Sequence, residues 1–152
     1  MSKKRERADE SEDGEKEKRA KTNEELKDLI EKTYERGEGW KIDEILYNEC
    51  RERRLDVAKH YSTLFFATIL GDGDIVKILI QNGEDVNAVG DKIEHKAIHK
   101  AAQHGRLDVA KVLIENGADV NALDRSKKTA LHEAAWHGHV DVVKCLIRNG
   151  AD

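Results

Sequence analysis

The segment LHEAAWHGH, residues 131–139, places three histidines and one glutamate within nine residues. These are residue types with which a metal-dependent hydrolase binds zinc and activates water. Two ligands share one face of an α-helix when they are four residues apart, whereas His132 and His137 are five apart, or about 140° around the helix axis. We therefore expect no catalytic residue, no metal and no cofactor. The less favoured alternative is a hydrolase whose site residues are His132, Glu133, His137 and His139.

The composition restricts the elements that can hold this segment in place. The chain has 152 residues, of which 38% are apolar, 38% are charged and 5% are aromatic, and it contains no proline. This balance supports one modest core and favours helices over a β-sandwich or barrel. The two cysteines, Cys50 and Cys145, are too few and too far apart for a disulfide framework. We expect a mostly helical protein of a reducing compartment, either cytoplasmic or nuclear.

Residues 1–21 form a charged N-terminal tail. They contain eight Lys or Arg and seven Asp or Glu residues, and they have too little apolar surface to offset the entropy cost of ordering. We expect this tail to be disordered. Two basic clusters separated by ten residues resemble a bipartite nuclear-import signal, which would consist of Lys4, Arg5, Lys16, Lys18 and Arg19. A solubilising charged tail is the alternative interpretation.

Residues 22–56 are expected to form a helical pair that caps the rest of the fold. Thr22 and Glu25 have the spacing of a capping box, and apolar residues recur at helical spacing over residues 26–34. A second helix is expected over residues 42–54, after the turn GEGW. Such a pair would cover the apolar end of the unit that follows it.

The histidine-rich segment belongs to an internal repeat. LHEAAWHGHVDVVKCLIRNGAD, from Leu131, matches IHKAAQHGRLDVAKVLIENGAD, which begins 33 residues upstream at Ile98. A weaker copy, LFFATILGDGDIVKILIQNGED, begins a further 34 residues upstream at Leu64, and the extra residue falls between Val89 and Ile93. This period indicates stacked supersecondary units. We place the units at about residues 57–90, 91–123 and 124–152, the last of them incomplete.

Each unit is predicted to contain two helices. The first carries paired alanines that allow its neighbours to approach closely, and it ends at Gly105 or Gly138. The second carries an apolar stripe, which in the last unit includes Ile147, and it stops at an Asn-Gly pair that contains Gly117 or Gly150. The repeated part of the chain is therefore expected to be all-α.

The units resemble ankyrin repeats, whose hallmarks are TPLHxAA, a following glycine and GADVNA. The corresponding stretches are TALHEAAWHG, KAIHKAAQHG and the degenerate STLFFATILG. The resemblance covers about residues 57–152 and implies a solenoid of helix-turn-helix repeats joined by hairpin loops. The usual proline is absent, and the usual hairpin glycine is replaced by Glu94 and Lys127. We expect these changes to loosen the turns without changing the fold.

The resemblance also implies a structural role for two of the histidines. In ankyrin repeats the TPLH histidine packs at the start of the first helix and forms local hydrogen bonds, and His99 and His132 occupy that place. The hydroxyls of Thr129 and Ser62 can cap the same helices. The residues to which we assign structural roles are His99, His132, Thr129, Gly105, Gly138, Gly117 and Gly150.

Ankyrin arrays bind macromolecules through a concave surface, which consists of the hairpin tips and the exposed face of the first helices. Carried over to this chain, that surface would contain Ile93, His95, Arg125 and Lys128 from the tips, and Gln103, His104, Trp136 and His137 from the helices. Trp136 is the leading candidate, because a large aromatic at an otherwise polar position has the character of an interface hot spot. Partial burial of Trp136 against another repeat is the alternative.

These observations favour a non-catalytic protein-interaction module or adaptor with a protein partner and no small-molecule substrate. A host-directed effector of an intracellular bacterium or virus, working by the same binding mode in the host cell, is an alternative. Binding to nucleic acid is not expected at a net charge of -4 with acids interleaved in the basic tail. No apolar run is long enough for insertion into a membrane.

The end of the repeat array gives a further expectation. Asp152 falls within a GADVNA motif, and the last helix keeps the apolar pattern of an internal repeat. A terminal repeat normally has a polar outer face. Either the chain is a fragment of a longer array, or it self-associates through this uncapped repeat.

Overall fold

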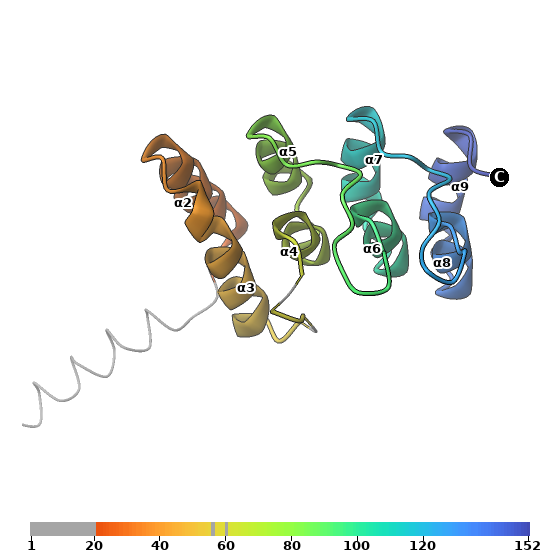
Figure 1. The fold of residues 1–152 in the computed structure, drawn as a ribbon, viewed down its shortest axis with the longest axis horizontal. Coiled ribbons are helices and arrows are strands. Elements are labelled where there is room, and N and C mark those ends of the chain that lie inside the picture. The colour runs from red at the N-terminus through yellow and green to blue at the C-terminus, as the bar shows by residue number, and fades with distance from the viewer. Residues whose placement is uncertain (1–20, 56, 60) are drawn as a thin grey trace, which may run out of the picture.

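The computed structural model describes residues 21–55, 57–59 and 61–152, and every regular element in these ranges is helical. Figure 1 shows the helices in two stacked rows. The outer row contains α2 (Asn23–Glu35), α5 (Gly73–Gln81), α7 (Leu107–Glu115) and α9 (Val140–Arg148). The inner row contains α3 (Ile42–Glu52), α4 (Thr63–Leu70), α6 (Ala97–Gln103) and α8 (Ala130–Trp136). The predicted all-α repeat fold is confirmed, whereas the five residues of the possible import signal lie outside the described ranges.

The N-terminal pair is joined to the array in the reverse order from the repeats. Its first helix, α2, packs against α5 in the outer row, and its second helix, α3, packs against α4 in the inner row. In each later unit the inner helix comes first along the chain. The pair is therefore a separate cap rather than a fourth, degenerate copy of the repeat.

Local signals fix the ends of this pair. The predicted capping box forms at α2, where Thr22 Oγ1 accepts from the Glu25 amide at 3.2 Å and Glu25 Oε2 accepts from the Thr22 amide at 2.8 Å. The turn to α3 contains a short 3-10 helix, η1 (Gly39–Lys41). Helix α3 ends at Glu52, two residues before the predicted limit, and Arg54 then adopts a left-handed backbone with φ 57°.

The core runs between the two rows of helices. The paired alanines of α6 are fully buried, so the inner helices approach closely. In α9 the stripe that faces the core consists of Val142, Cys145 and Leu146. The inclusion of Ile147 in this stripe was wrong, because its side chain is 55% exposed.

Both cysteines are buried and neither forms a disulfide. Cys50 lies between α3 and α4, and its thiol donates to the Phe66 carbonyl at 3.6 Å. Burial raises the pKa of Cys50 to about 12, so the thiolate does not form near neutral pH. Cys50 is a packing residue rather than a reactive one.

Asparagines of the DVNA segments join consecutive units along one edge of the stack. Asn87 Nδ2 donates to the Gly117 carbonyl at 2.9 Å, and Asn87 Oδ1 accepts from the Asp119 amide at 2.8 Å. Asn121 repeats both bonds one unit later, with the Gly150 carbonyl and the Asp152 amide. The recurrence of this motif at the repeat period therefore has a direct cause, since each asparagine satisfies two backbone groups of the next unit.

The extra residue in the first connection lies within the predicted range. Two residues separate Ala88 from the hairpin residue Asp91, whereas one residue separates Ala122 from the corresponding Asp124. Gly90 accommodates the additional residue, because its amide donates to the His95 carbonyl at 2.8 Å and so closes the hairpin. The remaining hairpin contacts of the two aspartates are equivalent, so the register of the repeat is restored at Asp91.

The two non-glycine residues at the hairpin turns are strained. Glu94 and Lys127 have φ of 63° and 61°, in the left-handed region that L-residues avoid. Both side chains are exposed, so glycine can replace either of them without loss of packing. The hairpins keep their shape despite the missing glycines, with the Asp91 and Asp124 carboxylates accepting backbone amides across each turn.

We expect Lys127→Gly to stabilise the protein by about 0.5–1 kcal/mol, because relief of left-handed strain exceeds the added entropy of the unfolded chain. Urea-induced unfolding measures the change, and Lys128→Gly, one residue later, is the matched control that should destabilise. Equal effects of the two substitutions would show that strain at position 127 has no influence on stability.

Candidate functional site

The exposed surface of the inner row and hairpin tips carries one large aromatic side chain. Trp136, the last residue of α8, is 85% exposed, so its side chain is not buried against another described element. His104 and His137 are exposed beside the ends of α6 and α8, and Gln103 is half-buried. Burial and the nearby positive charges of Lys100 and Arg106 lower the pKa of His104. At neutral pH His104 is thus a neutral aromatic group rather than a cation.

The hairpin tips extend this surface beyond the helices. Ile93 is 49% exposed, and Arg125 and Lys128 are also exposed. Adjacent tips are joined by a bond from the Arg125 amide to the Ile93 carbonyl at 2.9 Å. Of the residues predicted for the concave surface, seven lie at least partly open to solvent: Ile93, Gln103, His104, Arg125, Lys128, Trp136 and His137.

The eighth residue, His95, is not presented at the surface, and its placement there was wrong. Its side chain is 5% exposed, with Nδ1 3.0 Å from Asp91 Oδ2 and Nε2 3.2 Å from Asp124 Oδ2. Asp91 belongs to the same hairpin and Asp124 to the next one, so the imidazole lies between two units. The contacts to the two aspartates hold this side chain between the units.

Asp124 is held in its charged form. Burial opposes ionisation, but the hydrogen bonds from the Lys128 and Ser126 amides oppose burial and contribute to a lowered pKa of Asp124. The two amides donate to Oδ1 at 2.9 and 2.8 Å. Oδ2 therefore stays free to face His95.

His99 links its own helix to the next unit. Its Nδ1 accepts from the Lys96 amide at 3.1 Å, and its Nε2 donates to the carbonyls of Ala122 and Lys128 at 3.0 and 3.2 Å. These partners require a neutral imidazole with its proton on Nε2. Burial lowers the pKa of His99, which favours the same neutral form.

The lowered pKa of His99 predicts a pH dependence of stability. The contribution of neutral His99 is complete above the unfolded value of about 6.5 and declines as pH falls toward the lower folded pKa. We therefore expect the difference in unfolding free energy between wild type and His99→Gln to shrink below about pH 6.5. Urea titrations at several pH values measure it. A difference that stayed constant with pH would contradict the neutral assignment.

The histidines of LHEAAWHGH have separate partners. His132 Nδ1 lies 2.9 Å from Thr129 Oγ1 and accepts from the Thr129 amide at 3.0 Å. His137 donates from Nδ1 to the Glu133 carbonyl at 2.9 Å, and Gly138 follows with φ 74°. His139 donates from Nε2 to the Gln103 carbonyl at 3.1 Å. The segment thus contributes a helix start, a helix end and a bond between units.

Two sets of residues were missed by sequence reasoning. The first set consists of further exposed cations at the tips, Lys92 and Lys127, which the recurrence of basic residues in both hairpins could have indicated.

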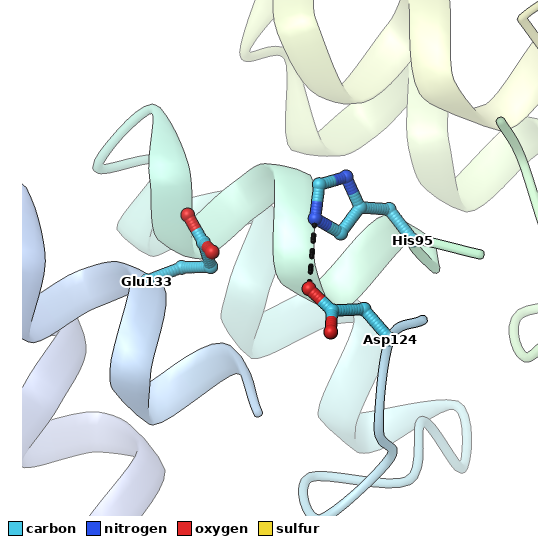
Figure 2. Close-up of side chains that lie close together, drawn as sticks. All are labelled: His95, Asp124 and Glu133. Atoms are coloured by element: carbon cyan, nitrogen blue, oxygen red, sulfur yellow. Dashed lines mark ion pairs between the residues drawn. The ribbon is translucent and has the colours of Figure 1, made fainter. Parts of the chain in front are cut away.

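The second set lies beneath the surface: among the described residues, one group could hold a metal ion, and it consists of His95, Asp124 and Glu133. Figure 2 shows these side chains reaching from three separate segments. No single stretch of sequence contains them, so no local motif could reveal the group.

The structure and the comparisons agree on the class of protein. No helix in the described ranges has both the length and the apolar character needed to cross a membrane. The family model of ankyrin repeats matches residues 64–152 in three copies, which is more than half of the chain. Among the curated proteins none matches. The matched residues coincide with the stacked units α4 to α9, and the chain therefore belongs to the ankyrin repeat family.

Proposed function

We propose that this chain is a non-catalytic protein-interaction module whose concave surface binds a protein partner, with Trp136 at the centre of the contact. Ankyrin repeats are generally modules of protein-protein interaction. The observation that carries the proposal is the 85% exposure of Trp136. A side chain of this size buries a large apolar area when a partner covers it, and tryptophan is enriched among interface hot spots.

We further propose that the partner supplies an acidic segment. Lys92, Arg125, Lys127 and Lys128 are exposed at the tips, and Glu94 is the exposed carboxylate among them. The hairpin aspartates do not cancel this charge, because Asp91 and Asp124 are turned inward and accept backbone amides. The chain as a whole has a net charge of -4, so the positive tips are a local feature. Such a local excess of positive charge speeds association with a negatively charged surface.

Affinity capture from the native cell, quantified protein by protein, tests the proposal. We expect Trp136→Ala to lower retention of the partner by about tenfold or more, since removal of a hot-spot tryptophan commonly costs about 2 kcal/mol or above. The matched control is Trp40→Ala, which removes a tryptophan that is 75% exposed but lies in η1, outside the repeats.

The same capture, repeated at rising salt, tests the acidic partner. Retention is expected to decrease as salt screens the tips. Equal retention by wild type and Trp136→Ala would refute the placement of the site, and retention that did not respond to salt would refute the acidic segment alone.

A further inference from the structure

The buried group under the concave surface has the donor set of a metal site. His95 and Asp124 come from consecutive hairpins and Glu133 from α8, and one potential ligand atom of each lies within 4.8 Å of the other two. The side chains of His95 and Asp124 are buried, each at 5% exposure, and that of Glu133 is 12% exposed. None of the histidines of LHEAAWHGH takes part. The group therefore shares Glu133, but no histidine, with the hydrolase motif that the sequence suggested.

Each of the two hairpin ligands is already oriented by a second contact. Asp91 Oδ2 lies 3.0 Å from His95 Nδ1, and in the tautomer that donates from Nδ1 to Asp91 the lone pair of Nε2 faces the group. This is the arrangement of carboxylate, histidine and metal that recurs in zinc proteins. In Asp124 the amides occupy Oδ1 and leave Oδ2 for the group.

The third ligand lacks a close partner. Within the described chain the Glu133 carboxylate has one recorded polar contact, to His137 Nδ1 at 3.8 Å, which is beyond hydrogen-bonding distance. The Glu133 side chain is 12% exposed, so its carboxylate still reaches solvent. The absence of a close protein partner within the described chain leaves the Glu133 carboxylate available as a ligand.

The charges of the group also favour a bound cation. Three buried carboxylates, those of Asp91, Asp124 and Glu133, lie near one buried ammonium, Lys100, whose Nζ is 3.6 Å from Asp91 Oδ2. His95 Nε2 and Asp124 Oδ2, 3.2 Å apart, also need a positive species between them when Nδ1 carries the imidazole proton. A proton between His95 and Asp124 satisfies only these two side chains, whereas a divalent cation can also bind the Glu133 carboxylate.

We propose that His95, Asp124 and Glu133 bind one zinc ion. One imidazole with two carboxylates suits zinc, whereas calcium takes six to eight oxygen ligands. Ligand atoms of tetrahedral zinc are about 3.4 Å apart at bond lengths of about 2.1 Å. The separation of 3.2 Å between His95 Nε2 and Asp124 Oδ2 is close to this value, and the Glu133 ligand atom lies within 4.8 Å of both. Water completes the coordination, and the ion fastens two hairpins and α8 together.

Calorimetric titration of the EDTA-treated full chain with zinc chloride tests the site. We expect one zinc per chain, a higher melting temperature with zinc, and a loss of affinity of about tenfold or more in Glu133→Gln and His95→Gln. Glu133→Gln loses no recorded hydrogen bond, so it serves if His95→Gln folds poorly. The matched control, His104→Gln, changes an exposed histidine of the same surface and should bind zinc normally.

Three results would overturn the site: no zinc binding by wild type, undiminished affinity in both ligand variants, or loss of binding in His104→Gln. The last would place the ion on exposed surface histidines. Because the titration uses zinc alone, without a protein partner, its outcome is independent of the proposed function.

Discussion

Gly90→Ala is expected to destabilise the protein by about 3 kcal/mol, which is a large effect for the addition of one methyl group. A Cβ at this position would lie 2.2 Å from Phe65 Cε1 and 2.4 Å from Cζ. Phe65 is fully buried, and its ring packs edge-on against Tyr61 with centroids 5.8 Å apart, so it cannot withdraw. Urea-induced unfolding measures the loss.

The matched control for this prediction is Gly117→Ala. Gly117 has a positive φ of 91°, and beyond its chain neighbours nothing lies within 4 Å of the place that the new methyl group would take. Only backbone strain therefore opposes this change, at about 1 kcal/mol. A double variant separates the clash from other causes. If Phe65→Leu is combined with Gly90→Ala, the total loss should be smaller than the sum of the two single losses. Strict additivity would contradict a clash with the ring.

His99→Ala is expected to cost about 3–4 kcal/mol, whereas His132→Ala is expected to cost about 1 kcal/mol. The two histidines hold the same place in successive repeats. His99 is fully buried, and its loss removes the ring partner of the Lys96 amide and of the Ala122 carbonyl, whereas the Lys128 carbonyl keeps its bond from the Asp124 amide. His132 is exposed, and its recorded ring bonds are to Thr129.

The comparison of the two variants by thermal or urea unfolding shows whether a repeat histidine acts within its own helix or between units. The structure predicts that most of the loss in His99→Ala comes from the bonds to the next unit. Similar losses in both variants would mean that the local bond to the start of the helix accounts for the whole effect.

The stacked helices could be predicted from the sequence because their signals are local. The Asn-Gly stops and the capping box at Thr22 depend on residues a few positions apart, and each formed as expected. The extra residue between the first and second units could also be assigned to a short connection, because the motifs on either side of it are local. The reversed order of the N-terminal pair could not be predicted, because two amphipathic helices can pack onto the array in either order.

The candidate site could be predicted only in part, because exposure depends on the neighbouring unit. His95 and Lys128 hold the same place in consecutive hairpins, but Asp124 of the next hairpin lies over His95, and no described hairpin lies over Lys128. One motif position is therefore buried in one repeat and exposed in the next. Trp136 and Ile69 also hold the same place in different repeats, and Trp136 is exposed whereas Ile69 is buried.

The central claim is that a protein partner covers Trp136 in the cell. Site-specific crosslinking tests it most directly: a photoreactive phenylalanine analogue replaces Trp136 in one variant and Ile147, an exposed residue of the outer helix α9, in another. The account predicts a crosslinked protein from position 136 and none of the same mass from position 147. Crosslinking of the same protein from position 147 alone, or from neither position, would contradict it.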